Sequence, residues 1–499
     1  MMFKKVLIAN RGEIAVRVIK GCQEMGVKTV AIYSDVDLKA PHVRMADESV
    51  ALGDPTPSES YINIQKIIDA ALEKGVDAIH PGYGFLAENP DFAKSCQAVG
   101  INFIGPSADV IAKMGNKIEA KKIMERAGVP VIPGYHGAEQ DMETLLEEGE
   151  SIGYPLLIKA TAGGGGKGMK IVHSQKELRP AIESAKREAL SSFGDDSVFI
   201  EKYLDQPRHI EFQILADSHG NVIHLNEREC SIQRRHQKII EETPSPIMTE
   251  ELRQEMGGAA VKAAEAAGYE NAGTVEFMVD ANRDYYFLEM NTRLQVEHPI
   301  TEAVTGIDLV KWQLRIADGQ EMTLTQENVK LHGHAIECRI YAEDPTNGFL
   351  PCTGKLSKVE FPVGPNVRND TGVEEGMVVS PYYDPMLGKL IVKGEDRKDS
   401  IEKMHWALSR YAVLGIKNNI PFLKEIINHE AFKRGDTTTH FIDIYFKDWT
   451  DIKERLPVEA LIALAVYDSL HPKREEIVKY KEADPHSPWK SAGRWRIGV

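Results

Sequence analysis

Residues 286–298 read Y-F-L-E-M-N-T-R-L-Q-V-E-H, and this stretch decides how the rest of the chain is interpreted. In an extended segment, side chains two residues apart share a face. One face then carries an acid, an amide, a guanidinium, an amide and an acid. These side chains belong to Glu289, Asn291, Arg293, Gln295 and Glu297. A strand with a merely solvated polar face favours Lys, Thr and Ser. The observed set instead suits the binding of a cation together with a small oxyanion.

The preceding residues predict a β-hairpin. Residues 274–280, T-V-E-F-M-V-D, have the composition of a strand, and four turn residues follow. This loop length places Asp280 opposite Tyr285 and Glu276 opposite Glu289. Opposed carboxylates about 5 Å apart repel each other unless a cation lies between them. Oxygen ligands suit Mg²⁺ or Mn²⁺ and are poor for zinc. The expected metal ligands are Glu276, Glu289 and Asn291.

Length and composition limit the class of protein. A chain of 499 residues with 42% hydrophobic residues has room for about three globular domains. The net charge of -15 argues against a nucleic-acid surface. The five cysteines are scattered without C-x-x-C spacing, which favours neither disulfides nor zinc and indicates a reducing cytoplasm. No apolar run approaches the ~20 residues of a membrane span, and the N-terminal run is too short for a signal peptide.

The first 115 residues predict a Rossmann-like parallel α/β domain. A strand at 6–10, a helix at 13–25 and a strand at 28–33 form a βαβ opening. The first strand, however, runs into N-R-G-E where a dinucleotide-binding fold has its triple-glycine turn. The match G-Y-G-F-L-A at 82–87 follows a later strand and stands alone. We therefore do not expect NAD binding.

A glycine-rich tip marks the next unit. Two short apolar strands, 154–160 and 169–172, flank T-A-G-G-G-G-K-G at 161–168. A flexible linker is one interpretation, but linkers seldom join two strands at hairpin spacing. A loop whose backbone N–H groups close over phosphates fits better. It is not a Walker A loop, because Gly168 follows Lys167 where Ser or Thr is required.

Three further segments carry polar side chains at informative places. Residues 198–204, V-F-I-E-K-Y-L, form a strand and a hinge suited to the edge of a purine. The run Q-R-R-H-Q-K at 233–238 is either a basic surface loop or a set of cations that neutralises bound anions. In the strand 333–341, Arg339 shares a face with Glu337, so Arg339 either pairs with that acid or serves a ligand.

Together, these motifs resemble the biotin carboxylase family of the ATP-grasp superfamily over residues 1 to about 446. The resemblance rests on A-N-R-G-E-I-A (9–15), H-P-G-Y-G-F-L-A-E (80–88), I-K-A-T-A-G-G-G-G-K-G-M (158–169), E-K-Y-L (201–204), Q-R-R-H-Q-K (233–238), E-M-N-T-R-L-Q-V-E-H (289–298) and E-C-R-I (337–340). One departure is Lys167, where many members have Arg.

The resemblance implies a fold, α/β and α+β in parts, with four regions. These are an N-terminal domain (1–115), an ATP-grasp domain (116–330) with a mobile glycine-rich lid at about 131–204, a mixed α/β C-terminal domain (331–446) and a tail (447–499).

The resemblance also implies ligands and roles. ATP would be contacted by Lys117, Lys159, Gly163, Gly164, Gly165, Gly166, Gly168, Glu201, Lys202, Leu204, His209, Gln233 and His236. Glu276, Glu289 and Asn291 would hold Mg²⁺ or Mn²⁺, with two ions expected. Bicarbonate would be bound by Lys238, Arg293, Gln295 and Val296, and Glu297 would deprotonate it. Biotin would lie near Tyr83 and Arg339. The catalytic set is Glu297, Arg293, Arg339 and Lys238.

The expected partners follow from the same resemblance. The only segment like a biotin-attachment hairpin, G-M-K-I at 168–171, is part of the lid, so the biotinylated carrier and the carboxyltransferase are expected to be other polypeptides. The tail is similar to that of two-subunit pyruvate carboxylases and resembles a docking segment, and a homodimer is expected. The alternatives are a component of an acetyl- or propionyl-CoA carboxylase, an ATP-grasp ligase that uses another carboxylate, and a non-catalytic ATP-binding regulator.

Overall fold

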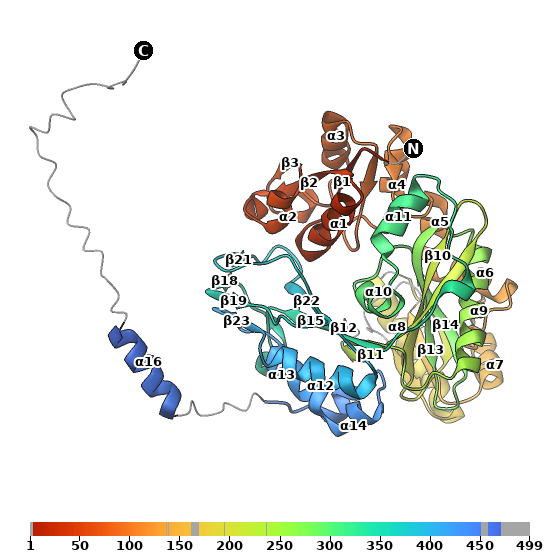
Figure 1. The fold of residues 1–499 in the computed structure, drawn as a ribbon. Coiled ribbons are helices and arrows are strands. Elements are labelled where there is room, and N and C mark those ends of the chain that lie inside the picture. Colours follow the sequence, from red (N-terminus) through yellow and green to blue (C-terminus); the bar gives the residue numbers. More distant parts are fainter. Residues whose placement is uncertain are drawn as a thin grey trace, which may run out of the picture. The chain divides into compact units, whose positions relative to one another are not determined.

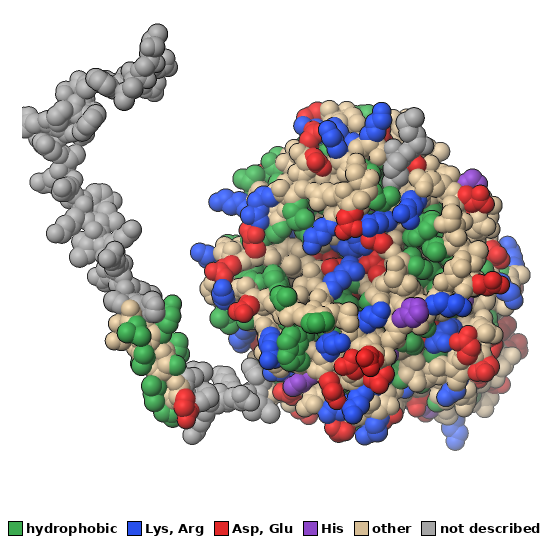
Figure 2. All heavy atoms as spheres, in the orientation of Figure 1, with side chains coloured by type: hydrophobic (Ala, Val, Ile, Leu, Met, Phe, Trp, Pro, Cys, Tyr) green, Lys and Arg blue, Asp and Glu red, His purple; other side chains and the backbone are tan. Residues whose placement is uncertain are grey.

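The computed structural model describes residues 3–135, 137, 139–160, 169–193, 195–235, 237–450 and 458–470 (Figure 1). Residues 1–450 form one compact unit, and residues 451–499 form a second. The described part of the second unit is helix α16 (Val458–Leu470). Its apolar side chains are exposed along its length (Figure 2). Among the described helices, none combines the length and apolarity needed to cross a membrane.

A five-stranded parallel sheet in the order β3-β2-β1-β4-β5 begins the first unit. Its strands are β1 (Lys5–Ile8), β2 (Lys28–Ser34), β3 (Glu48–Gly53), β4 (Ala78–His80) and β5 (Asn102–Phe103). Its helices are α1 (Gly12–Glu24), α2 (Pro41–Met45), α3 (Ile64–Lys74), α4 (Pro90–Ala98) and α5 (Ala108–Gly115). Val6, Leu7 and Ile8 are all buried, as expected for a parallel strand covered on both faces. The predicted parallel α/β fold of this region is confirmed.

The turn after β4 is fixed by Asn10, which follows β1. The Asn10 amide donates to the carbonyls of Pro81 and Tyr83, at 2.7 and 2.8 Å. Gly82 has φ +63°, and a Cβ on it would lie 2.9 Å from the Asn10 side chain. Glycine at this position therefore lets the turn approach the Asn10 side chain closely.

A small antiparallel sheet in the order β6-β9-β7-β8 forms the region expected to be the lid. It contains β6 (Gly134–Tyr135), β7 (Leu156–Ala160), β8 (Lys170–Val172) and β9 (Val198–Lys202), with α7 (Met142–Ile152) and α8 (Gln175–Phe193). The two apolar strands predicted around the glycine tip pair as β7 and β8, with Leu157 opposite Ile171. The tip itself, 161–168, lies outside the described residues.

An eight-stranded sheet in the order β14-β13-β10-β11-β12-β15-β22-β20 organises the rest (Figure 1). Its strands are β10 (Arg208–Ala216), β11 (Val222–Arg234), β12 (Gln237–Thr243), β13 (Asn271–Val279), β14 (Tyr285–Asn291), β15 (His334–Tyr341), β20 (Val367–Thr371) and β22 (Met386–Gly394). Because β12 pairs with β15, the sheet runs continuously across residue 330, where a boundary was expected.

Helices and short strands surround this sheet. The helices are α6 (Lys117–Arg126), α9 (Glu250–Ala267), α10 (His298–Thr305), α11 (Leu309–Ala317), α12 (Arg397–Leu408), α13 (Ile420–Asn428), α14 (Glu430–Arg434) and α15 (Phe441–Tyr445). The short strands are β16 (Glu343–Asp344), β17 (Leu350–Pro351), β18 (Gly354–Lys355), β19 (Lys358–Glu360), β21 (Val378–Val379) and β23 (Ala412–Leu414). Helix α10 packs on β15 and β22, and α1 packs on β20 and β22.

The predicted hairpin forms, but its register near the turn is shifted. Val279 pairs with Tyr285, so the expected pairing of Asp280 with Tyr285 is wrong by one residue. A bulge between Glu276 and Phe277 corrects the shift, because it adds one residue to the β14 side. Glu276 therefore lies opposite Glu289, as predicted.

The extended conformation expected over residues 289–297 ends at Asn291. The chain then forms an irregular loop and begins α10 at His298. Leu294 is fully buried in a core with side chains of β1 and α11, which fixes the loop in place. The polar side chains of 293–297 consequently converge through loop geometry and not through strand parity.

Candidate active site

A row of buried ionic side chains crosses the eight-stranded sheet. Consecutive strands pair Glu289 with Glu276, Glu276 with Glu211, and Glu211 with Arg228. Farther along the sheet, Glu241 pairs with Glu337 and Arg339 pairs with Lys389. Directly paired residues point to the same face of a sheet. The sheet thereby gathers acids from distant parts of the sequence into one site.

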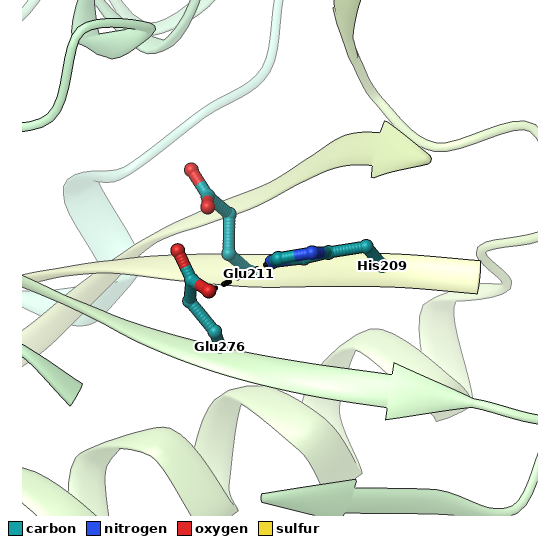
Figure 3. A group of neighbouring side chains, drawn as sticks. All are labelled: His209, Glu211 and Glu276. Carbon is teal, nitrogen blue, oxygen red and sulfur yellow. Dashed lines mark ion pairs between the residues drawn. The ribbon is translucent and has the colours of Figure 1, made fainter. Parts of the chain in front are cut away.

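Lys238 on β12 is the centre of this row. Its ammonium donates to Glu211 at 2.5 Å, to Glu276 at 2.8 Å and to Glu297 at 2.8 Å. Figure 3 shows Glu211 and Glu276 extending from β10 and β13 toward the same side, with the ring of His209 beside Glu276. The ring nitrogen Nε2 of His209 lies 2.9 Å from Glu276.

The charges around Lys238 shift the pKa values of its partners in opposite directions. Burial opposes ionisation of Glu297, but Lys238 and Arg339 outweigh burial and hold its pKa well below the usual range. Burial raises the pKa of Glu211, and the neighbouring acids Glu297 and Glu276 add to this effect. Glu297 is thus a carboxylate at neutral pH, and Glu211 is the acid in this group that takes up a proton more readily.

Glu276 also accepts hydrogen bonds from two amides of the loop. Asn291 donates at 2.9 Å and Gln295 at 3.2 Å. Arg293 donates to the side-chain oxygens of Gln295 at 2.8 Å and Asn291 at 3.1 Å. Asn291, Arg293 and Gln295 therefore form one hydrogen-bonded group with Glu276, and Glu297 is joined to it through Lys238. Glu88, at the end of the H-P-G-Y-G-F-L-A-E motif, holds the Nε of Arg293 at 2.8 Å.

Two sets of side chains offer a metal-binding arrangement. His209, Glu211 and Glu276 have ligand atoms within 4.8 Å of one another, as do Glu211, Cys230 and Glu297. The ammonium of Lys238 contacts all three of these glutamates and lies where a metal ion would otherwise join them, so a metal is disfavoured at this point.

Two of the three predicted oxygen ligands, Glu289 and Asn291, line a cavity. Glu289 lines a cavity of about 200 Å³ together with Asn291 and Lys117. Burial and the adjacent Glu276 raise the pKa of Glu289, which is the sign of an acid short of positive charge. The oxygens of Glu276, Glu289 and Asn291 fit the hard-cation preferences of Mg²⁺ or Mn²⁺.

Arg339 serves the site and does not pair with Glu337. Its Nε donates to Glu241 at 2.6 Å, and its Nη2 donates to Glu297 at 3.0 Å. The alternative pairing with Glu337 is therefore wrong, because the guanidinium bonds instead to Glu241, which lies opposite Glu337 on the neighbouring strand β12. Glu297 is the residue that caps the start of α10, where backbone N–H groups also favour a negative charge.

The residues expected to bind nucleotide lie at the border between the lid and the sheet. Lys159 donates to Glu201 at 2.6 Å, and Lys121 also pairs with this acid. The two lysines overcome burial and lower the pKa of Glu201 to about 2. The side-chain amide of Gln233 lies 2.9 Å from Nδ1 of His209, which places both at the edge of the acid cluster.

Two backbone N–H groups of the expected purine hinge already donate hydrogen bonds within the protein. Lys202 N–H donates to the carbonyl of Pro133 at 2.8 Å, and Tyr203 N–H donates to the carbonyl of Pro155 at 2.9 Å. Leu204 follows this pair. His236 and the glycines from Gly163 to Gly168 lie outside the described residues, and their roles stay predictions.

Tyr83 and Val296 both lie near the ammonium of Lys389. The carbonyl of Val296 accepts a hydrogen bond from Lys389 at 2.8 Å, and the same ammonium lies 5.7 Å from the centroid of the Tyr83 ring. Tyr83 was expected beside biotin and Val296 beside bicarbonate, so the two expected subsites adjoin.

Sequence reasoning missed several residues of this site. Glu211 lies two residues after His209 in an alternating strand, and that parity was a usable signal. Glu88 ends a motif that was recognised for other reasons. Glu241 and Lys389 gave no local signal, because only strand pairing brings them to Arg339 and to the loop after β14.

Comparison with known proteins gives consistent matches along the first 444 residues. Family models match for the biotin carboxylase N-terminal domain at residues 2–111, for the ATP-binding domain of the carbamoyl-phosphate synthase L chain at 116–325, and for the biotin carboxylase C-terminal domain at 337–444.

Three similar proteins illustrate the range of the likeness. A pyruvate carboxylase subunit of Methanothermobacter thermautotrophicus is 56% identical over 444 residues, covering 89% of this chain and 90% of that one. The alpha subunit of the mitochondrial methylcrotonoyl-CoA carboxylase of Dictyostelium discoideum is 52% identical over 495 residues, covering 99% and 70%. The biotin carboxylase domain dimer of the Hydrogenobacter thermophilus 2-oxoglutarate carboxylase, solved with MgADP, ADP and bicarbonate, superimposes with a TM-score of 0.82 at 47% identity, covering 89% and 98%.

Proposed function

This chain belongs to the biotin carboxylase family of ATP-grasp enzymes, and on that premise we propose that it carboxylates carrier-bound biotin as one component of a multi-subunit pyruvate carboxylase. The reaction uses ATP and bicarbonate. The observation that carries the proposal is the position of Glu297, whose two oxygens contact Lys238 at 2.8 Å and Arg339 at 3.0 Å. One carboxylate is thus placed between the cation assigned to bicarbonate and the cation assigned to biotin.

The nucleotide and its metal occupy the lid side of the sheet in this proposal. Lys117, Lys159, His209 and Gln233 contact the phosphates and ribose, while Glu201, Lys202 and Leu204 serve the adenine. His236 and the glycines from 163 to 168 would complete this set. Glu276, Glu289 and Asn291 hold Mg²⁺ or Mn²⁺, which would neutralise phosphate charge and polarise the γ-phosphoryl group.

Bicarbonate lies beside the loop after β14. Lys238 and Arg293 neutralise it, and Gln295 and Val296 orient it. Glu297 takes the proton of bicarbonate, and the resulting dianion attacks the γ-phosphorus of ATP as ADP leaves. The product is carboxyphosphate. Two anions meet in this step, so several cations are needed before in-line attack is feasible.

Biotin is carboxylated in the second half of the reaction. Carboxyphosphate breaks down to CO₂ and phosphate, and this phosphate takes the N1 proton of biotin. Arg339 stabilises the negative charge that develops on the ureido oxygen, and N1 attacks CO₂. Tyr83 lies beside the biotin ring. A closed lid keeps water from the labile intermediate.

Pyruvate is the proposed final acceptor because the relative whose name includes pyruvate carboxylase matches over 90% of its own length. A second candidate is an acyl-CoA acceptor. It is favoured by the methylcrotonoyl-CoA carboxylase relative, whose match extends over 99% of this chain and so includes the tail. We further propose a homodimer, as in the 2-oxoglutarate carboxylase domain structure, and a reducing cytoplasm, in keeping with five unpaired cysteines.

The first experiment measures ADP release by the purified protein with and without bicarbonate and free biotin. We expect release to require bicarbonate and to increase with biotin. An amino acceptor requirement without any response to bicarbonate would select another ATP-grasp ligase, and nucleotide binding without turnover would select a regulator.

The second experiment identifies the acceptor. The chain is used to capture the biotinylated carrier and its transferase from native cells, and the reconstituted complex is supplied with labelled bicarbonate. Incorporation of label into pyruvate supports the pyruvate carboxylase assignment. Incorporation into an acyl-CoA, and none into pyruvate, would overturn it.

A further inference from the structure

Lys389 is a fully buried lysine that none of the assigned roles uses. Its side chain has no exposed surface. The ammonium lies 3.2 Å from a carboxylate oxygen of Glu13 and donates to the carbonyl of Val296 at 2.8 Å. A buried ammonium is strongly disfavoured unless it is paired and hydrogen-bonded, so these two contacts account for its position.

The three groups come from three different parts of the chain. Glu13 lies in the first turn of α1, Lys389 in β22, and Val296 in the loop that follows β14. On β22, Lys389 lies directly opposite Arg339 of β15, so both cations project from the same face of the sheet. The ammonium of Lys389 therefore connects α1 and β22 to the loop after β14, which is the proposed bicarbonate-binding loop.

The contact with a loop carbonyl distinguishes Lys389 from an ordinary structural ion pair. Peptide groups are planar, so the Val296 carbonyl fixes the plane of the peptide that leads to Glu297. Glu297 is the N-cap residue of α10, and its side chain makes no capping hydrogen bond. The direction of this one carbonyl consequently sets the position of the Glu297 backbone relative to Gln295.

Further acidic and aromatic side chains lie around the Lys389 ammonium. Both carboxylate oxygens of Glu337, on the adjacent strand, are buried and have no hydrogen-bond partner in the described part of the chain. The ring of Tyr83 presents its face to the ammonium at 5.7 Å, a distance suited to cation–π attraction. Asp370 lies directly opposite Lys389 on β20, so three acids and an aromatic face surround an ammonium whose hydrogen bond is directed at the loop.

We propose that Lys389, with Glu13 as its counter-ion, is a positioning residue that holds the Val296–Glu297 peptide in the geometry needed to bind bicarbonate. The inference rests on the proposed function of the same loop. Lys389 touches neither ATP nor the metal ligands in this arrangement. Its loss should therefore affect bicarbonate specifically, because an error of about 1 Å in a positioning contact can lower a rate by 10²-fold.

The experiment compares the double variant Glu13→Gln/Lys389→Met with the wild type. The pair of changes removes both charges together, so no uncompensated acid or ammonium is left at this contact. We expect the KM for bicarbonate to rise at least tenfold, the KM for ATP to stay within twofold, and the biotin-independent release of ADP to fall in parallel with bicarbonate binding. Wild-type bicarbonate-dependent turnover is measured first, so failure of the proposed function is recognised separately.

The matched control is Glu227→Gln/Arg253→Met, which removes another buried ion pair, with a 2.9 Å contact between α9 and β11. This control should leave the KM for bicarbonate unchanged. If the Lys389 double variant is insoluble, Lys389→Gln retains a neutral donor and should show a smaller rise in the same KM. A KM for bicarbonate within twofold of the control in either folded variant, or an equal change in the KM for ATP, would overturn the proposal.

Discussion

Glu241 and Glu242 are neighbours on β12, yet they belong to two buried ionic clusters that differ in how well their acids are paired with cations. Glu241 faces the site cluster around Lys238, where one ammonium contacts three carboxylates. Glu242 faces a second cluster, in which Arg397 donates to both of its oxygens at 2.7 and 3.0 Å and His334 lies at 2.9 Å. Successive residues of a strand point to opposite faces, so one strand builds both clusters.

The difference lies in charge balance. Arg397 satisfies Glu242 in a bidentate pair and gives its remaining donors to backbone carbonyls of Phe432 and Lys433. Its cluster is complete without any further ion. The ammonium of Lys238 is shared by three acids, of which Glu211 and Glu297 also pair with Arg228 and Arg339. The adjacent Glu289, which lines the cavity, makes no ion pair with any described residue. Under-compensated charge of this kind is typical of a site that binds cations or transfers protons.

The largest effect should come from replacement of Glu297, the carboxylate that contacts both Lys238 and Arg339. Glu297→Gln keeps the shape of the side chain but removes its ability to accept a proton from bicarbonate. We expect biotin-dependent ADP release to fall by about 10³-fold, within the usual range for loss of a general base. Binding of ATP should change less than twofold, which calorimetry with a non-hydrolysable analogue can measure. Retained turnover would remove Glu297 as the base.

Loss of Arg397 from the Glu242 cluster should lower the stability of the protein and leave its activity nearly unchanged. Arg397→Met leaves Glu242 buried with only His334 beside it, and loss of one partner of a buried ion pair costs about 3 kcal/mol. We expect this loss in the free energy of unfolding, measured with urea, while kcat at 25 °C stays within twofold. A fall in kcat without loss of stability would mean that this cluster also takes part in the chemistry.

A smaller effect is expected when Glu276, one of the three proposed metal ligands, is replaced. Glu276→Gln retains hydrogen bonding to its neighbours but supplies a weaker ligand and one negative charge fewer. The Mg²⁺ concentration that gives half-maximal turnover should rise about 10- to 100-fold, and turnover should recover partly at saturating Mg²⁺. Glu227→Gln is the control, because Glu227 is a buried acid paired with Arg253 away from the cavity. An unchanged Mg²⁺ requirement would contradict the assignment of Glu276.

The smallest predicted effect is a pH dependence of stability. Arg397 and His334 outweigh burial and lower the pKa of Glu242 to about 2, from an ordinary value near 4.5. A depressed pKa stabilises the fold above the unfolded-state value, and this stabilisation is lost as pH falls toward the folded-state value. From pH 6 to pH 4 the wild type should therefore lose about 1 kcal/mol relative to Glu242→Gln, measured by urea unfolding at each pH. A difference that does not change with pH would contradict the pairing.

Much of the candidate site was visible in the sequence because its residues lie close together along the chain. The Glu276–Glu289 pair was predicted from turn length and alternation, and it is observed because a bulge compensates for the one-residue error at the turn. The two short apolar strands around the glycine-rich tip were also predicted, and they pair as β7 and β8. Neither the pairing at the turn nor the compensating bulge was predictable, because neither gives a local signal in residues 274–291. The loop after Asn291 also escaped the alternation rule, since burial of Leu294 takes precedence over strand parity.

The sequence by itself determined the family, the parallel N-terminal sheet and the identity of the acids, amides and cations near residues 289–297. Only the tertiary structure decided how those groups are neutralised. Lys238 of β12 and Arg339 of β15 both contact Glu297, and Arg339 lies opposite Lys389 of β22, although these strands are separated by up to about 150 residues in sequence. Local patterns report which face a side chain occupies. Electrostatic pairing depends on distances of about 3 Å between strands, and those distances are fixed by the order and register of the folded sheet.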